Sequence, residues 1–501
     1  MSIKNFIKRA RDIMRQDAGI NGDAQRIEQI AWMLFLKIYD DVESLWEIEL
    51  DEYESIIPDP LRWRNWADTS ANNKKALKGD ELLDFVNNRL FPGLKNIQIP
   101  PNCSKRKSIV KAVFEDTHNF SKDGVQLREL MQLINECDFS DSENSHAFGE
   151  IYETILRELQ NAGAAGEYYT PRPLTDFMAN HVSLKLGDRV ADFACGTGGF
   201  LNSARRVLDI PAAEGTNEDR ALLNRSFYGV EKKSLPYLLC VTNLLLNGIE
   251  EPNIRHGNAL TNNVMDLSHS DKYDVILMNP PYGGSEKTIV QENFPENFRS
   301  AETADLFMAL IMYSLKEGGR AAVVVPDGFL YGGAGAKRNL KERLLEKFNL
   351  HTIVRLPASV FAPYTLIATN IIFFDKPTQK TREAEGKTVT QKTWFYRLDL
   401  PEGYKSFSKT KPILSEHLKT LVDWWNDRQE VEDHGMFKSK AYTAEELKAL
   451  DYNFGQCGYG EIKEEILPPE KLIENFLKER AEHQKKIDDT LAKILEILGR
   501  E

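Results

Sequence analysis

Cysteine, long apolar runs and positive charge are all scarce in this sequence. Five cysteines among 501 residues lie scattered, without paired or zinc-binding spacing, which indicates a reducing cytoplasm and predicts no metal site. No apolar run reaches about 18 residues, so we expect no membrane-spanning helix and no membrane partner. The N-terminal residues also lack the apolar core of a signal peptide.

The balance of charge bears on any role with nucleic acid. The chain has 64 Lys and Arg against 76 Asp and Glu, which gives a net charge of -12. Affinity for DNA depends on Lys and Arg meeting phosphates, so an acidic chain is not expected to bind DNA strongly by itself. If DNA is the substrate, a partner supplies much of the binding.

The length allows about two to four domains, and the composition is that of an ordinary globular protein. We predict a helical N-terminal domain at residues 1–147, a catalytic domain at residues 148–400 and a C-terminal region at residues 401–501. In the first, apolar residues recur at helical spacing from Asp23, the predicted cap, to Trp46. Nothing in this domain has catalytic spacing, and a packing or docking module is the expected role.

The central motif follows a short apolar run, residues 275–278, that is typical of a buried parallel strand. The strand must end at Asn279-Pro280-Pro281-Tyr282, because consecutive prolines cannot continue a ladder. The Asn279 side-chain oxygen and the Pro280 carbonyl can each accept one hydrogen of a planar amino group, which frees its lone pair towards a methyl donor. Tyr282 can stack on the base or amide that carries the nitrogen. The alternative is a rigid strand-end turn with a buried tyrosine.

A second motif is the strand, glycine turn and helix that opens a doubly wound fold. Residues 189–194 are predicted as strand, Cys195-Gly-Thr-Gly-Gly-Phe200 as the turn and residues 201–207 as helix. Glu231 ends the next strand, 227–230, where an acidic side chain can take both hydroxyls of a ribose. Asn258 follows a third strand and can bond an adenine edge. A phosphate or dinucleotide site is the competing interpretation of the glycine turn.

Four flanking segments complete the prediction. A Tyr-Thr-Pro loop at residues 167–174 caps a new helix and is a candidate wall for a cofactor pocket. The polar stretch 283–299 suits a substrate lid or a disordered loop equally well. An antiparallel pair at 354–357 and 370–375 is expected to close the sheet near Asp375. The amphipathic helix at 469–498 either packs within the chain or docks on a partner helix.

These motifs together resemble the modification (M) subunits of type I restriction-modification systems, which are adenine-N6 DNA methyltransferases. The resemblance covers nearly the whole chain and rests on Glu167-Tyr-Tyr-Thr-Pro-Arg172, Ala191-Asp-Phe-Ala-Cys-Gly-Thr-Gly-Gly-Phe200 and Asn279-Pro-Pro-Tyr282, in that order. This order matches the gamma arrangement of amino-methyltransferases. The family usually has Phe where this chain has Tyr282, a mild departure, because both rings stack. The implied fold class is α/β, a Rossmann-like S-adenosylmethionine-dependent methyltransferase sheet with a helical N-terminal domain and a helical C-terminal tail.

The resemblance also implies a cofactor and a set of residues. S-adenosylmethionine would be the methyl donor, and Asp192 would lie near its sulfonium. The other cofactor-binding residues would be Glu167, Tyr168, Tyr169, Thr170, Pro171 and Arg172 from the Tyr-Thr-Pro loop, Cys195, Gly196, Thr197, Gly198 and Gly199 around the methionine portion, Glu231 at the ribose and Asn258 at the adenine. The catalytic residues would be Asn279, Pro280, Pro281 and Tyr282.

The implied substrate is an adenine flipped out of duplex DNA, since its amino group is otherwise held in a base pair. Two M subunits would assemble with one specificity subunit that reads the sequence, and a restriction subunit can join them. Two alternatives stay open at this point. One is an amino-methyltransferase that acts on a protein glutamine or on RNA, and the other is a non-catalytic scaffold that binds the donor.

Overall fold

The computed structural model describes residues 3–51, 53–67, 76–100, 105–136, 169–381, 389–433, 435–459 and 469–498. The chain divides into two compact units, Met1–Gly458 and Tyr459–Glu501. Within the described residues, no helix has both the length and the apolar character needed to cross a membrane.

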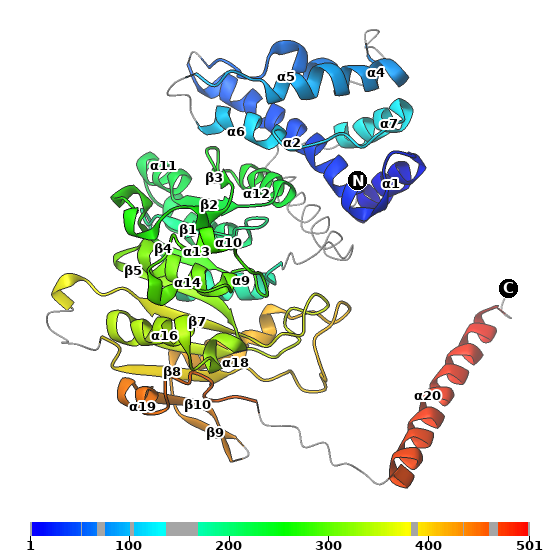
Figure 1. The fold of residues 1–501 in the computed structure, drawn as a ribbon. Helices are drawn as coiled ribbons and strands as arrows, with labels where there is room; N and C mark the ends of the chain where they lie inside the picture. The colour runs from blue at the N-terminus through cyan, green and yellow to red at the C-terminus, as the bar shows by residue number, and fades with distance from the viewer. Residues whose placement is uncertain are drawn as a thin grey trace. The chain divides into compact units, whose positions relative to one another are not determined.

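The first part of the larger unit is helical, as predicted, and is drawn in blue to cyan in Figure 1. Its helices are α1 (Ile3–Gln16), α2 (Gly22–Glu49), η1 (Asp59–Leu61), α3 (Trp63–Trp66), α4 (Gly79–Phe85), η2 (Val86–Leu90), α5 (Phe91–Lys95), α6 (Lys105–Phe114) and α7 (Gly124–Asn135). The predicted cap of α2 was wrong by two residues, because Asn21 is the N-cap and Asp23 lies inside the first turn. The core of this part is aromatic, with Trp32 edge-on to Phe91 at a centroid distance of 5.1 Å.

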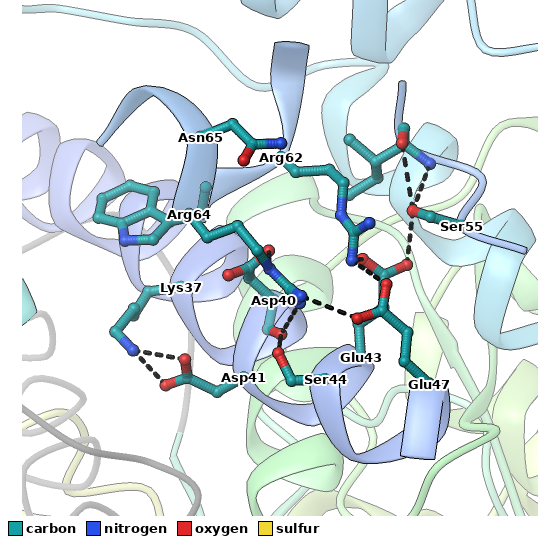
Figure 2. Close-up of polar contacts among 12 residues, drawn as sticks. Lys37, Asp40, Asp41, Glu43, Ser44, Glu47, Ser55, Arg62, Arg64 and Asn65 are labelled. Carbon is teal, nitrogen blue, oxygen red and sulfur yellow. Dashed lines mark hydrogen bonds and ion pairs between the residues drawn. The ribbon is translucent and has the colours of Figure 1, made fainter. Parts of the chain in front are cut away.

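A buried ion network ties the second half of α2 to the segment that follows it (Figure 2). Glu43, whose side chain is fully buried, accepts a hydrogen bond from the Ser55 hydroxyl at 2.7 Å and pairs with Arg62 at 3.2 Å. Arg64 Nε donates to Asp40 at 2.9 Å. Because burial alone would penalise these carboxylates, the arginines and hydroxyls are what make the arrangement tolerable.

The second part of the larger unit is a ten-stranded sheet in the order β3-β2-β1-β4-β5-β7-β6-β8-β10-β9. The strands are β1 (Val190–Asp192), β2 (Phe227–Glu231), β3 (Asn253–His256), β4 (Tyr273–Met278), β5 (Leu315–Pro326), β6 (Asn349–Arg355), β7 (Thr369–Asp375), β8 (Lys392–Arg397), β9 (Val431–Asp433) and β10 (Met436–Thr443). Strands β1 to β5 pair in parallel, and β7 is antiparallel to both β5 and β6. The fold class is therefore α/β, as predicted, with parallel strands β1 to β5 and an antiparallel β7.

One expectation about the sheet was wrong. The antiparallel pair β6 and β7 is present, but the sheet does not close near Asp375, since β8 pairs in parallel with β6 and β10 then pairs with β8. The sequences of these late strands, Lys-Thr-Trp-Phe-Tyr-Arg in β8 and Met-Phe-Lys-Ser-Lys-Ala-Tyr-Thr in β10, lack the aliphatic run by which buried strands are found. The predicted boundary at residue 400 stays a prediction, although the sheet itself continues past it.

Helices cover both faces of the sheet, because the central strands are apolar on both sides. In β4, Val275 and Leu277 belong to one hydrophobic cluster and Ile276 and Met278 to another. The helices of this part are α9 (Arg172–His181), α10 (Gly199–Ala213), α11 (Asn217–Arg225), α12 (Ser234–Leu246), α13 (Thr288–Gln291), α14 (Thr303–Ser314), α15 (Asp327–Tyr331), α16 (Gly335–Lys347), α18 (Lys419–Asn426) and α19 (Ala444–Ala449), with the short turns η3 (Ala259–Thr261), η4 (Val264–Asp266), η5 (His269–Asp271), η6 (Glu296–Phe298) and η7 (Ser415–Leu418). Helix α12 also packs against α2 and α6, which joins the helical part to the sheet.

The smaller unit contains α20 (Pro469–Leu498), the terminal helix that the sequence predicts. Several large apolar side chains on it are more than half exposed: Ile473, Phe476, Leu477, Ile487 and Leu491. They recur at steps of three, four and fourteen residues, which places them along one side of the helix.

Candidate active site at the carboxyl end of the sheet

Strand β4 ends at Met278 and delivers Asn279 to the edge of the sheet. The Asn279 Nδ2 atom donates a hydrogen bond to Thr170 Oγ1 at 2.9 Å. The Tyr282 hydroxyl donates to Asn279 Oδ1 from the other side. The side-chain amide is therefore held at both ends, by the residue before Pro171 and by the last residue of its own motif.

The glycine turn lies between β1 and α10. Gly196 and Gly198 both have positive φ, +53° and +81°, and the Gly198 amide donates to the Cys195 carbonyl at 2.8 Å. Only glycine adopts such angles without strain. A Cβ atom built on Gly196 would meet no protein atom within 4 Å, so open space lies directly in front of this backbone. Arg172 reaches the same turn and donates to the Gly199 carbonyl at 3.4 Å.

Two carboxylates stand at the ends of β1 and β2. Glu231 accepts from the Gly196 amide at 2.9 Å with one oxygen and from the Lys233 amide at 2.8 Å with the other, which fixes it against the glycine turn. Asp192 is 1% exposed and accepts from the Ala194 amide at 3.1 Å. Burial raises the pKa of Asp192 to about 8, the charge of Glu231 adds to the rise, and the bond from Ala194 opposes it.

One cavity of about 880 Å³ joins the glycine turn to the Asn-Pro-Pro-Tyr motif. Many of the residues predicted for the site line it: Tyr169, Thr170, Asp192, Cys195, Gly196, Thr197, Gly199, Glu231, Asn258, Asn279, Pro280 and Pro281. Pro171, Gly198 and Tyr282 lie next to lining residues in the chain but are not in the cavity wall themselves, and Arg172 lies two residues after Thr170 and is also not in the wall. Glu167 and Tyr168 are outside the described residues.

Asn258 has a local structural role as well as a place in the cavity wall. It caps the short helix η3, where its side-chain oxygen accepts from the Leu260 amide at 3.0 Å. This bond leaves the side-chain nitrogen as its donor towards the cavity.

Several residues of the cavity wall were not predicted from the sequence. Ala24 comes from α2 in the helical part, for which no catalytic role was expected, while Pro363, Tyr364 and Lys409 come from loops after β6 and β8. None of these positions has a motif or a spacing that marks it. Lys232 also lines the cavity, and its position directly after Glu231 is a signal that sequence reasoning passed over.

A family model for N-6 DNA methylases matches residues 143–465, and a model for the HsdM N-terminal domain matches residues 3–136. The chain belongs to the N-6 DNA methylase family. The methylase subunit of the type I restriction enzyme EcoEI from Escherichia coli is 49% identical over 428 residues, covering 85% of this chain and 84% of that protein. The EcoKI methylase subunit from Escherichia coli (strain K12) is 30% identical over 445 residues, covering 85% and 76%.

Solved structures agree with this assignment. A modification subunit of a type I restriction enzyme from Vibrio vulnificus YJ016 superposes with a TM-score of 0.76 at 39% identity, covering 89% of this chain and 92% of that chain. A chain from a type I restriction-modification system, studied for its assembly and conformational transition, superposes with a TM-score of 0.77 at 35% identity, covering 99% and 98%.

As a type I N-6 DNA methylase, this chain transfers a methyl group from S-adenosylmethionine to the N6 amino group of adenine in DNA. Methylation of a protein glutamine or of RNA, and a purely architectural role, are not what this family membership supports. The cavity fits the cofactor, because three features that suit it line the same cavity. They are a glycine backbone with open space before it, an acidic residue at the end of β2 where a ribose would bind, and a buried carboxylate at the end of β1.

Proposed function

We propose that Asn279 and Pro280 hold the amino group of a flipped-out adenine in this cavity while the glycine turn holds the methyl donor. S-adenosylmethionine supplies a methyl group bound to a positively charged sulfur. The single observation that carries the proposal is the continuous cavity lined by Gly196 at one end and Asn279 at the other. Substrate and donor can therefore meet without leaving the protein.

Each residue of the site has its own role in the proposed methyl transfer. The Asn279 oxygen and the Pro280 carbonyl each accept one amino hydrogen, so that the nitrogen lone pair turns towards the donor. The Tyr282 ring stacks on the base after its hydroxyl releases the Asn279 oxygen. Glu231, fixed by two backbone amides, accepts from the ribose hydroxyls of the cofactor, and Asp192 faces its positive charge.

The test is Asn279→Ala in the complete complex with its specificity subunit. We expect loss of methyl transfer to duplex DNA, while binding of S-adenosylmethionine, measured by calorimetry, stays within a few-fold of the parent protein. Asn262→Ala, an exposed asparagine outside the cavity wall, is the matched control and should keep full activity. Retained methylation by Asn279→Ala would remove this residue from the mechanism.

The apolar side of α20 supports a second part of the proposal, which concerns a protein partner. Ile473, Leu477, Ile487 and Leu491 lie along one side of this helix and are each about half exposed or more. Such a surface suits a helix of the specificity subunit, in an assembly of two modification subunits with one specificity subunit that a restriction subunit can join. A cytoplasmic location goes with this assembly and also stays a prediction.

Substitution of the helix surface tests this partner. Leu477→Glu together with Leu491→Glu should abolish co-purification with the specificity subunit but leave cofactor binding unchanged. Gln484→Glu, at an exposed position of α20 between Leu477 and Ile487, adds charge without removing apolar surface and should co-purify normally. Native mass spectrometry of the complex gives the subunit ratio, and a ratio other than two to one would refute the proposed stoichiometry.

A further inference from the structure

Two loops that are distant in the sequence lie together at the cavity. The loop between β6 and β7 contributes Pro363 and Tyr364 to the cavity wall, and the loop after β8 contributes Lys409. They are pinned to each other, because the Phe407 amide donates to Ser359 Oγ at 2.9 Å and both residues are buried. The surface around this side of the cavity is therefore a defined part of the fold.

The first loop ends in an apolar tip. Leu366 is 72% exposed and Ile367 is 44% exposed, two and three residues after Tyr364 of the cavity wall. The backbone of the tip is held locally, since the Ile367 amide donates to Thr365 Oγ1 at 3.0 Å. Single exposed apolar residues are common on protein surfaces and need no explanation. Two adjacent exposed aliphatic side chains beside a substrate cavity are less common and indicate a contact surface.

The second loop is basic. Lys405, Lys409 and Lys411 are all exposed, and the stretch from Gly403 to Ile413 has no acidic residue, although the chain as a whole has a net charge of -12. A local positive loop on an acidic protein attracts anions at that place and not elsewhere. Phosphate groups of DNA are the anions that the activity of this family brings to the cavity.

We propose that these two loops are the chain's own contact with its target duplex, with Leu366 and Ile367 as an apolar wedge and Lys405, Lys409 and Lys411 as a phosphate-binding loop. The proposal rests on the proposed function, because a base must leave the helix to reach Asn279. Unstacking that base costs free energy, and apolar side chains inserted between base steps are a general means of offsetting such a cost. The wedge fills the place in the DNA base stack that the adenine leaves, and the lysines bind the phosphates of the DNA backbone beside it.

The wedge is tested with Leu366→Ala together with Ile367→Ala in the complete complex. Single-turnover methylation is measured on a fully paired duplex and on one whose target adenine faces an abasic site, where unstacking costs less. We expect the rate on the paired duplex to fall about tenfold or more, and the rate on the abasic duplex to stay within about threefold of the parent. Ile210→Ala with Leu222→Ala, exposed aliphatic residues of α10 and α11 outside the cavity wall, is the control and should change neither rate.

Equal losses on the two duplexes, or no loss on the paired one, would overturn the wedge. A parent complex that methylates neither duplex would instead refute the proposed function, so the two failures are distinguishable.

The lysines are tested by the salt dependence of DNA binding. Lys405→Gln with Lys411→Gln should lower the slope of log affinity against log salt by about 0.9 for each phosphate that a lysine no longer neutralises.

The matched control for the lysines is Lys185→Gln with Lys347→Gln. Both lysines are exposed and outside the cavity wall, and they precede the amino ends of two strands, Lys185 by five residues for β1 and Lys347 by two residues for β6. This pair removes the same charge and should leave the salt slope unchanged. An equal change of slope in both pairs would show a general effect of net charge and would overturn the phosphate-binding loop.

Discussion

The side-chain nitrogen of Asn279 donates a hydrogen bond to the hydroxyl of Thr170, 109 positions earlier in the chain. A primary amide can rotate by a half turn, which would exchange its oxygen and nitrogen. In the observed orientation the nitrogen donates to Thr170 and the oxygen accepts from Tyr282, so the oxygen is turned away from Thr170 and is available to accept an amino hydrogen. Thr170, expected from the family resemblance to face the cofactor, therefore also acts as a positioning residue for Asn279.

Thr170→Val removes this acceptor without changing the volume of the side chain much. We expect kcat for methylation to fall about tenfold or more, in line with the loss of one positioned hydrogen bond of about 1–3 kcal/mol, while KM for S-adenosylmethionine changes little. Thr170→Ser, which keeps the hydroxyl, should restore most of kcat. A raised KM for the cofactor with unchanged kcat would instead assign Thr170 to cofactor binding alone.

Tyr282→Phe removes the hydroxyl that bonds the Asn279 oxygen. That oxygen must exchange the hydroxyl for an adenine hydrogen, so the variant should bind an extrahelical base about twofold to tenfold more tightly, while the ring keeps its stacking surface. Fluorescence of 2-aminopurine placed next to the target adenine reports this binding, because the probe loses its stacking neighbour when the adenine leaves the helix. Tyr282→Ala, which loses the ring as well, should bind the base more weakly than the parent. Equal impairment in both variants would show that the hydroxyl itself supports binding of the base.

Asp192 predicts a pH dependence of cofactor binding. Its pKa is raised to about 8 by burial, so the ligand-free protein holds a proton there below that pH. A cationic donor favours the carboxylate, and binding below pH 8 must release the proton. Affinity for S-adenosylmethionine should therefore rise with pH up to about 8, by at most tenfold per pH unit, and level off above it.

The neutral thioether product, S-adenosylhomocysteine, is the control for this effect. It carries the same amino acid and nucleoside, so the ratio of the two affinities isolates the positive sulfur. The ratio should rise with pH in the parent and stay flat in Asp192→Asn. A flat ratio in the parent protein would place Asp192 away from the charge of the donor.

Arg62→Met tests the buried ion network of the helical part. Arg62 and Glu43 are 11% and 0% exposed at their side chains, so the substitution leaves a buried carboxylate without its cation. We expect the free energy of unfolding at pH 7 to fall by about 3–5 kcal/mol. Burial already raises the pKa of Glu43, and loss of Arg62 raises it further, so the penalty should shrink as the pH is lowered and Glu43 takes up a proton.

Urea unfolding followed by tryptophan fluorescence measures this change, since Trp63 and Trp66 lie in the same segment. Glu43→Gln in the Arg62→Met background removes the stranded charge and should recover much of the stability. A penalty that does not depend on pH, and that Glu43→Gln does not relieve, would show that the arginine stabilises this region through packing of its stem.

The core of the site was predictable because parallel strands end at one edge of a sheet. The sequence predicts buried strands at residues 275–278 and 227–230. Asn279 and Glu231 follow these strands, so they were expected to lie near the glycine turn for any conformation of the loops between them. The excursion from Asp209 to Asn224, which lengthens the spacing from Gly196 to Glu231, is largely helical and does not disturb this meeting. The position of these residues therefore followed from topology, and their roles remain predictions.

Other features depended on tertiary context. Helix α14 ends at Ser314, and Gly318 and Gly319, which as a pair would be typical of a helix end, lie within β5, where Gly318 has φ of +74°. A glycine in the sequence is typical both of a helix end and of an irregularity in a strand. Only the pairing with a neighbouring strand, which the sequence does not show, decides which of the two forms. The polar stretch 283–299 is likewise anchored by Phe294 and Phe298, which are each 2% exposed. Two phenylalanines in a polar run gave too little periodicity to predict that anchoring.

Ala24 and Lys409 both belong to the wall of one cavity, although nearly the whole chain separates them. During synthesis, the glycine turn and the Asn-Pro-Pro-Tyr motif leave the ribosome long before Lys409 does. The wall of this cavity thus stays unfinished in a growing chain until the ribosome has added Lys409.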